Sequence, residues 1–301
     1  MINNRVALIT GSTGFVGSYL AKRLVNKGWD VHIIVRPNSS LDIISDVIEK
    51  LTIYRHNGTT GGLLGILNEA KPKIVFHLSS LFLAEHQPKD IEPLIKSNIL
   101  FGTQLVEAMI SKQVYKLVNT GTSWQHYNNE DYNPVNLYAA TKHAFEAIFK
   151  FYTETTPLKV ITLKLFDTYG PNDPRPKLFA LLRKVASENK PLAMSPGNQL
   201  IDLVYIDDVV EAFILAAARL LENKVQSHER YAVSSDKPIK LVDIVKVYEK
   251  IIGRKLPIKW GDRPYRNREV MKPWQNYKVL PAWKPNISLE EGIKRCTMAT
   301  H

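Results

Sequence analysis

The chain has 301 residues, of which 45% are hydrophobic and 23% are charged. This composition excludes a disordered, collagen-like or coiled-coil protein, and the length fits one large domain or two smaller ones. Forty Lys and Arg against 29 Asp and Glu give a net charge of +11, which predicts an anionic partner. The single cysteine, Cys296, excludes a disulfide framework. With no signal peptide and no apolar segment long enough to span a bilayer, a cytoplasmic protein is expected.

Short apolar runs rich in β-branched residues alternate with helical patterns through the first half of the chain. The expected strands are 5–10, 31–35, 51–54, 73–78, 117–119 and 158–165, and the expected helices between them are 16–27, 43–50, 63–70, 88–112 and 137–155. Strands that are apolar on both faces are typical of a parallel sheet covered by helices. The pattern therefore predicts an α/β fold with a Rossmann-like, doubly wound parallel sheet.

After residue 165 the alternation weakens and prolines cluster. Helical patterns return at 178–187, 209–221 and 241–252. The chain is expected to divide into a dinucleotide-binding core over 1–166, to which some later segments return, and a smaller, mainly substrate-binding lobe over 167–301.

A glycine-rich loop joins the first expected strand to the first expected helix. Gly11, Gly14 and Gly17 have the spacing G-x-x-G-x-x-G. Glycines at such a turn let the backbone approach a pyrophosphate, which then lies at the helix N-terminus. The loop predicts a dinucleotide site, and the alternative is a βα turn without a ligand.

The end of the second expected strand carries an arginine where an NAD enzyme usually has an acidic residue. Arg36 is followed by Pro-Asn-Ser-Ser, which includes Ser39. A guanidinium at this position would pair with a 2′-phosphate. We expect NADP(H) in preference to NAD(H); the alternative is a surface arginine without a ligand.

The segment 254–278 holds eight Lys and Arg against two acidic residues, together with two Trp and two Tyr. It is either a solvated basic loop or a surface for an anion that carries a ring, and composition does not separate a nucleotide sugar from RNA.

Six motifs together resemble the extended short-chain dehydrogenase/reductases of the NAD-dependent epimerase/dehydratase family. They are the glycine loop Thr10–Gly17, the strand end Val75–Ser80, the segment Asn98–Thr103 (in a register one residue longer than N-x-x-G-T), Tyr138 with Lys142 as Y-x-x-x-K, Phe166–Pro171, and Trp283–Gly292. The resemblance covers almost the whole chain.

The resemblance implies a set of site residues. The cofactor contacts are expected to be Gly11, Ser12, Thr13, Gly14, Phe15, Val16, Arg36, Ser39, Asn57, Gly58, Leu78, Ser79, Ser80, Asn98, Tyr138, Lys142 and Phe166. The substrate contacts are expected to be Ser123, Trp124, Asp167, Tyr205 and Arg263. By the same analogy the protein is expected to form a homodimer.

Tyr138 and Lys142 are four residues apart on an expected helix, so both side chains leave one face of it. An ammonium beside a phenol is expected to lower the pKa of the phenol, which can then exchange a proton with an alcohol. The resemblance to the family's strand end implies that Thr122 supplies the hydroxyl that binds the substrate oxygen, with Ser123 as the alternative.

Two departures from the family bear on the reaction. Ser123 and Trp124 stand where sugar-nucleotide 4,6-dehydratases have Asp-Glu, and Ile201 stands where the family has an arginine that binds diphosphate. We therefore expect NADPH-dependent reduction of the C4 keto group of a nucleotide-diphosphate 4-keto-6-deoxy or dideoxy hexose. The alternatives are an NAD-dependent nucleotide-sugar 4-epimerase and a non-catalytic NADP- or RNA-binding protein. Neither a metal, a membrane nor a nucleic acid is expected as a partner.

Overall fold

The computed structural model describes residues 5–298. Its strands are β1 (Val6–Thr10), β2 (Asp30–Val35), β3 (Leu51–Arg55), β4 (Ile74–His77), β5 (Lys116–Thr122), β6 (Lys159–Leu165), β7 (Asp167–Tyr169), β8 (Leu192–Met194), β9 (Leu200–Ile201), β10 (Leu203–Tyr205), β11 (His228–Val233), β12 (Ile239–Lys240) and β13 (Ile258–Trp260). Its α-helices are α1 (Phe15–Asn26), α2 (Thr60–Ala70), α3 (Ile91–Ile95), α4 (Phe101–Ser111), α5 (Leu137–Thr155), α6 (Leu178–Glu188), α7 (Ile206–Leu221), α8 (Leu241–Ile252) and α9 (Leu289–Met298).

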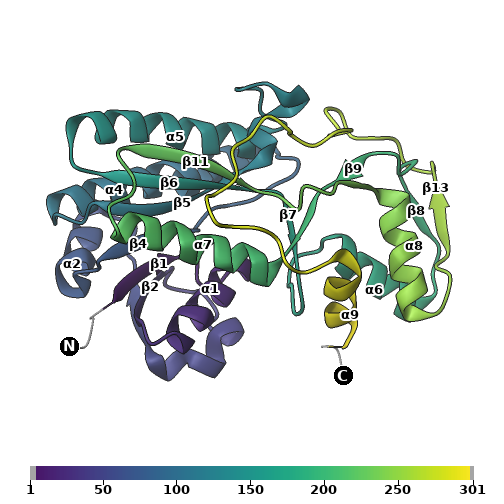
Figure 1. The fold of residues 1–301 in the computed structure, drawn as a ribbon, viewed down its shortest axis with the longest axis horizontal. Helices are drawn as coiled ribbons and strands as arrows, with labels where there is room; N and C mark the ends of the chain where they lie inside the picture. The colour runs from purple at the N-terminus through teal and green to yellow at the C-terminus, as the bar shows by residue number, and fades with distance from the viewer. Residues whose placement is uncertain (1–4, 299–301) are drawn as a thin grey trace.

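A seven-stranded sheet in the order β11-β6-β5-β4-β1-β2-β3 forms the centre of the protein (Figure 1). Every pairing within it is parallel. The strand order reverses direction between β1 and β4, and ligands of open α/β sheets bind beside this switch point at the carboxyl ends of the strands. The expected doubly wound parallel sheet is therefore confirmed.

Helices cover both faces of the sheet. One buried cluster joins the sheet to α2, α4 and α5, and the other joins it to α1 and α7. Figure 1 shows α5 and α4 on one side of the strands and α7 and α1 on the other. Because both faces are covered, the strands are buried along most of their length, which explains their continuous apolar runs.

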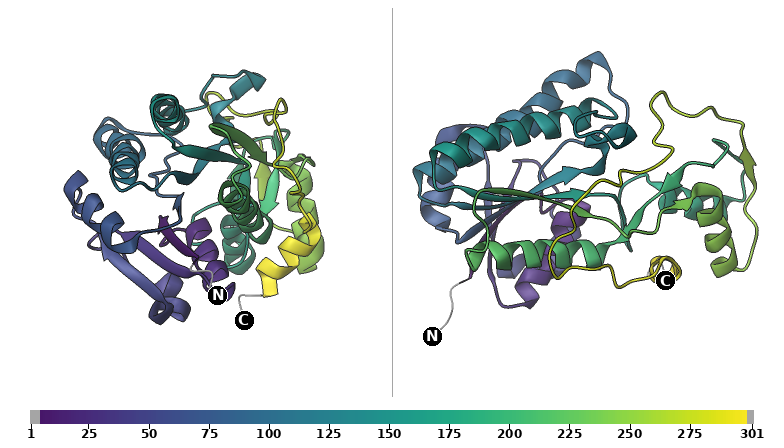
Figure 2. Two further views of the ribbon diagram at one scale, coloured as in Figure 1. Left: turned by 60° about the vertical axis from the view of Figure 1, so that its left-hand side comes forward. Right: turned by 45° about the horizontal axis from the view of Figure 1, so that its top comes forward.

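A smaller lobe extends beyond the carboxyl ends of the strands (Figure 2). It contains α6, α8 and α9 with the short pairs β8–β13, β9–β12 and β7–β10. The larger buried cluster continues into it through side chains such as Phe179, Ile244 and Tyr248. Later segments also return to the sheet, because β11 is its edge strand and α7 packs against α1. The boundary at residue 167 stays a prediction.

Between α3 and α4 the helix contains one π-helical turn, Lys96–Leu100. A π turn accommodates one extra residue, which accounts for the longer register of the N-x-x-G-T motif. The turn also places Asn98 in the interior, where its amide oxygen accepts from Leu81 N at 2.7 Å and its amide nitrogen donates to Thr141 Oγ1 at 2.9 Å. Within residues 5–298, no helix is both long and apolar enough to cross a membrane.

Candidate active site

The glycine loop closes tightly between β1 and α1. At Gly11 the backbone has φ of +78°, and a Cβ there would lie 2.6 Å from Ser79 N. At Gly17 a Cβ would lie 2.1 Å from the Gly11 carbonyl oxygen. Both positions therefore require glycine for close backbone approach.

The start of α1 suits an anionic group. Gly14 is the exposed N-cap; no side chain caps the helix, and its first turn holds no acidic residue. The unpaired N–H groups of such a turn bind phosphate well. Ser12 Oγ, moreover, is buried without a hydrogen-bond partner in the described structure. The loop thus fits the pyrophosphate of a dinucleotide.

Two arginines lie at the ends of the neighbouring strands β2 and β3. Arg36 is exposed after β2, and Arg55 at the end of β3 donates to the carbonyl oxygens of Arg36 and Pro37. Within residues 5–298 neither side chain forms an ion pair with a carboxylate. The sequence predicts a role for Arg36 but not for Arg55, because only the pairing of β2 with β3 brings Arg55 beside this position.

Helix α5 carries the expected tyrosine and lysine. It begins after Asn136, whose side chain caps the Ala139 N–H at 2.9 Å. Tyr138 lies in the first turn and faces the cavity, and Lys142, 3% exposed, lies one turn further on with its Nζ 5.9 Å from the Tyr138 ring centre.

Burial controls the ionisation of Tyr138. It raises the pKa of the phenol to about 12, against the lowering influences of a hydrogen bond with Ser80 and of the Arg175 charge. The expectation that Lys142 lowers this pKa below its ordinary value is thus wrong for the free protein, because desolvation of the phenolate outweighs nearby charges. Tyr138 is a protonated phenol at neutral pH.

Thr122 ends β5 and is held on two sides. Its backbone N–H donates to Gln125 Oε1 at 3.0 Å, and its Oγ1 accepts from Trp124 N at 3.3 Å. A hydroxyl that accepts one bond keeps its own proton to donate. The side chain lines the cavity and is 8% exposed, so a ligand in the cavity can reach its hydroxyl.

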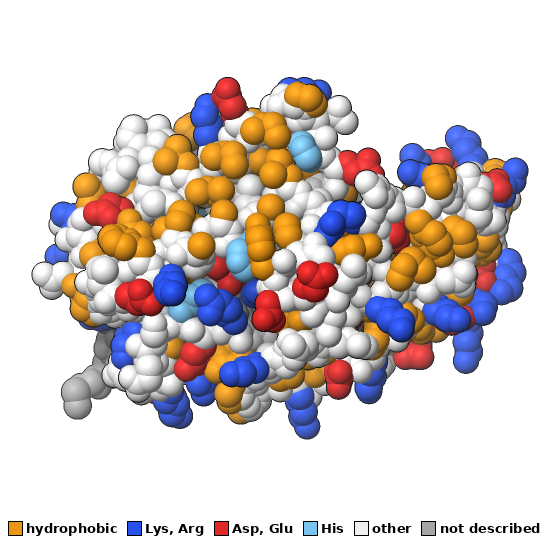
Figure 3. Space-filling model, turned by 90° about the horizontal axis from the view of Figure 1, so that it is seen from above, with side chains coloured by type: hydrophobic (Ala, Val, Ile, Leu, Met, Phe, Trp, Pro, Cys, Tyr) orange, Lys and Arg blue, Asp and Glu red, His pale blue; other side chains and the backbone are white. Residues whose placement is uncertain are grey.

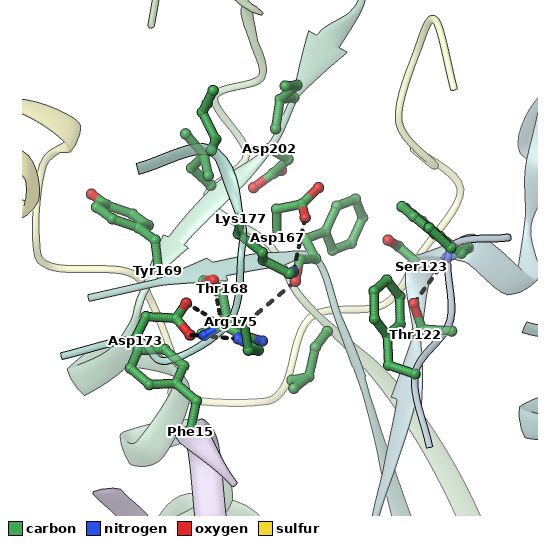
Figure 4. Close-up of a pocket in the computed structure, with 18 of the residues that line it drawn as sticks. Phe15, Thr122, Ser123, Asp167, Thr168, Tyr169, Asp173, Arg175, Lys177 and Asp202 are labelled. Atoms are coloured by element: carbon green, nitrogen blue, oxygen red, sulfur yellow. Dashed lines mark hydrogen bonds and ion pairs between the residues drawn. The ribbon is translucent and has the colours of Figure 1, made fainter. Parts of the chain in front are cut away.

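The cavity measures about 530 Å³ and lies between the core and the smaller lobe. Figure 4 shows the part of its wall that includes Phe15, Thr122, Ser123 and Asp167. Of the expected site residues, it is lined by Gly11, Gly14, Phe15, Val16, Leu78, Ser80, Thr122, Ser123, Trp124, Tyr138, Phe166 and Asp167. One cavity therefore contains the glycine loop, the phenol and the hydroxyl.

Three cations in this wall are each paired with a carboxylate. Arg175 binds Asp173 at 2.7 Å, Lys177 binds Asp167 at 3.3 Å (both drawn in Figure 4), and Arg266 binds Glu269 at 2.9 Å. Lys177 also lies over the Phe82 ring at 5.6 Å, and Arg266 lies over Trp124 at 5.5 Å. The cavity thus presents cations beside aromatic rings, an arrangement that suits a phosphorylated ligand with a sugar ring.

Two expected substrate residues lie outside the cavity lining. Arg263 is exposed, and Arg266 of the same basic segment occupies the wall in its place. Tyr205 is buried against Tyr169, with its hydroxyl hydrogen-bonded to Arg295. The sequence did hold a signal for Arg266: Glu269 follows it three residues later, and this spacing allows an ion pair within one turn.

Several expected cofactor residues also lie outside that lining. They are Ser12, Thr13, Arg36, Ser39, Asn57, Gly58, Ser79, Asn98 and Lys142. Lys142 and Asn98 are buried, and Asn57 uses its side-chain oxygen to accept from Thr59 N at 3.1 Å. Across residues 5–298, no group of three His, Cys, Asp or Glu side chains is arranged to hold a metal ion.

Thr122→Val should lower turnover more than Ser123→Ala does. Valine keeps the shape of threonine but has no proton to donate to a substrate oxygen, and loss of such a donor costs about a hundredfold. Ser123→Ala should leave turnover within about threefold of wild type. Steady-state rates of the two variants measure this, and the reverse ranking would give the role to Ser123.

Known proteins resemble this chain over nearly its full length. CDP-abequose synthase from Salmonella muenchen is 27% identical over 97% of both chains, and a probable UDP-glucuronate 4-epimerase from Rhizobium meliloti is 24% identical over 96% of this chain and 94% of its own. Among solved structures, UDP-glucose 4-epimerase from Thermotoga maritima with UDP-glucose has a TM-score of 0.86 at 22% identity, covering 97% of each chain.

The family assignment rests on the larger part of the chain. Residues 7–232 match the NAD dependent epimerase/dehydratase family, and this span contains the glycine loop, Thr122, Tyr138 and Lys142. The chain therefore belongs to the NAD-dependent epimerase/dehydratase family and is an enzyme of the extended short-chain dehydrogenase/reductase type.

Proposed function

We propose that the enzyme uses NADPH to reduce the C4 keto group of a nucleotide-activated 4-keto-6-deoxy or dideoxy hexose. The observation that carries this proposal is the cavity that the phenol of Tyr138 and the hydroxyl of Thr122 line together. Reduction of a ketone needs a proton donor at the forming alkoxide. The side chains that follow Thr122, Ser123 and Trp124, include no acid–base pair for eliminating water.

The comparisons support the substrate class. CDP-abequose synthases and UDP-sugar 4-epimerases are among the relatives, and each of these names contains a nucleotide sugar. The cations of the cavity provide places for a diphosphate: Arg266 and Lys177 would bind its oxygens, while Trp124 would contact the sugar. A diphosphate bound there would compete with Asp167 and Glu269 for these two cations.

In the proposed reaction, the cofactor supplies hydride when bound. The uncapped start of α1 would hold its pyrophosphate, and Lys142, whose Nζ lies 5.9 Å from the Tyr138 ring centre, would hold its ribose. Thr122 donates its hydroxyl proton to the keto oxygen and so stabilises the charge that develops there. Tyr138 then transfers its phenolic proton to that oxygen, which becomes the C4 hydroxyl.

Arg36→Ala should weaken NADPH binding by about ten- to a hundredfold and leave NADH binding almost unchanged, because only NADPH has a 2′-phosphate. Arg55→Ala should act in the same direction, since the Arg55 guanidinium holds the backbone of Arg36 and Pro37. Lys27→Ala, an exposed charge at the other end of α1, is the control. Fluorescence titrations with both cofactors measure the effect. Equal weakening of both cofactors, or a wild-type preference for NADH, would contradict the NADP assignment.

A 4-epimerase is the second candidate, because several relatives carry that name. Such an enzyme first removes a proton from the C4 hydroxyl and therefore needs Tyr138 as a base. Arg36 disfavours the NAD that such an enzyme would retain.

We also propose a homodimer through the face of α3–α5. Ile91, Ile95, Leu100 and Phe151 are large apolar side chains exposed there, at 39% to 63%. Figure 3 looks onto the α5 side of the protein, where hydrophobic side chains gather. An exposed apolar patch of this kind is typical of an interface.

The direct test of the reaction is a screen of nucleotide-linked 4-keto-6-deoxy sugars with NADPH. We expect one of them to consume NADPH, with NMR of the product showing a new hydroxyl at C4. Consumption of none of them, together with interconversion of C4 epimers, would establish the epimerase instead.

A further inference from the structure

A buried carboxylate that the proposed reaction does not use lies behind the catalytic residues. Glu146, on α5 one turn beyond Lys142, is 2% exposed. Gln125 Nε2 donates to its Oε1 at 2.7 Å, and Arg230 Nε donates to its Oε2 at 2.9 Å. Lys164 Nζ lies 3.6 Å from Oε1. A buried charge with this many partners is held in one geometry.

The first connection runs from Glu146 to the end of β5. Gln125 bridges the two: its amide nitrogen donates to Glu146, and its amide oxygen accepts from the backbone N–H of Thr122 at 3.0 Å. The amide can satisfy both partners only in one orientation. Glu146 thereby orients the side-chain amide of Gln125, and that amide holds the backbone N–H of Thr122.

The second connection runs along α5 itself. Positions 142 and 146 are one helical turn apart, so both side chains leave the same side of the helix, where the ion pairs of Glu146 are with Lys164 and Arg230. Both side chains are 3% exposed or less, where Coulomb attraction is much stronger than in water.

We propose that Glu146 is a positioning residue for two catalytic groups at once: it holds Thr122 in place through Gln125 and keeps Lys142 charged. The inference rests on the roles proposed above for Thr122 and Lys142.

Several titratable groups surround Lys142 and Glu146. Burial lowers the pKa of Lys142 to about 8, and the Glu146 charge opposes that shift. Around the pair, burial also lowers the pKa of His77 and His228 to about 3 and that of His126 to about 4, so these imidazoles are neutral. The remaining neighbours are Tyr138 and His143 on α5, Lys164 on β6 and Arg230 on β11.

Two substitutions separate the two connections. Glu146→Gln keeps the length of the side chain and an oxygen for Gln125 but removes the charge. Without that charge the pKa of Lys142 should fall, so its ammonium should lose its proton about one pH unit lower than in wild type. Glu146→Asp keeps the charge but shortens the reach toward Gln125, so it should release Thr122 while leaving Lys142 nearly unchanged.

The test uses the free protein and does not depend on turnover. NMR of ¹³C-labelled lysine follows the Lys142 titration, and amide hydrogen exchange follows the Thr122 N–H. We expect Glu146→Gln to shift the titration, and Glu146→Asp to speed exchange at Thr122 by about tenfold. Glu229→Gln, which removes the charge of an ion-paired glutamate on β11, is the control and should change neither.

An unshifted Lys142 titration in folded Glu146→Gln would overturn the electrostatic role, and unchanged Thr122 exchange in folded Glu146→Asp would overturn the tether. If neither substitution changes either readout, Glu146 only packs. Because no substrate is involved, failure of the reductase proposal alone leaves these results interpretable.

Discussion

Tyr138→Phe should lower turnover by about 10²- to 10⁴-fold, because it deletes the proton donor and nothing else. The ring stays in its buried place beside Phe82, so the cavity keeps its shape. NADPH affinity should stay within about threefold of wild type. Single-turnover rates with the keto substrate and a fluorescence titration of the cofactor measure the two quantities separately.

Tyr152→Phe is the matched control for this substitution. Tyr152 lies on the same helix, and its hydroxyl donates to Glu107 Oε2 at 2.8 Å. Its loss should leave turnover almost unchanged. Near-normal turnover by Tyr138→Phe, or an equal loss in both variants, would be incompatible with Tyr138 as the acid.

Gly17→Ala should weaken NADPH binding by at least tenfold, about 1.4 kcal/mol, and lower the melting temperature. A Cβ at this position would lie 2.1 Å from the Gly11 carbonyl oxygen, which is backbone and cannot rotate away. The loop must therefore shift, and it takes the pyrophosphate site with it. Overpacking of this kind costs about 1–3 kcal/mol of folding stability. Cofactor titration and thermal denaturation measure both effects.

Gly65→Ala provides the comparison within the same protein. Gly65 also lies inside a helix, α2, but a Cβ there would meet nothing within 4 Å. The substitution should raise stability by up to about 1 kcal/mol, because alanine favours helix over glycine. If Gly17→Ala behaves like Gly65→Ala, the close packing of the loop does not control cofactor binding.

The sheet could be predicted from sequence because its inner strands are buried on both faces and leave continuous apolar runs. The seventh strand, β11, was missed for the opposite reason. It lies at the edge of the sheet, and its first three residues, His228, Glu229 and Arg230, are polar. An edge strand that begins with three polar residues shows neither a continuous apolar run nor a regular apolar–polar alternation. The π turn over Lys96–Leu100 likewise appeared in the sequence only as an extra residue in a motif.

The site could be predicted where local spacing determines geometry. Tyr138 and Lys142 share a helix face whatever the rest of the fold does, and the glycine loop is a continuous segment. Arg55 and Arg266, by contrast, reach their places through strand pairing and through a long connection in the smaller lobe. The raised pKa of Tyr138 could not be predicted from the sequence either, because it depends more on burial than on neighbouring charges.

The direction of hydride transfer is the central claim, and isotope transfer tests it most directly. The enzyme would be incubated with NADPH deuterated at the transferable position of the nicotinamide, together with the 4-keto-6-deoxy nucleotide sugar that the screen selects. The reductase account predicts deuterium at C4 of the sugar, with one NADP⁺ formed for each product molecule. A product without deuterium, formed without net loss of NADPH while the protein retains bound NAD, would contradict the account and identify an epimerase.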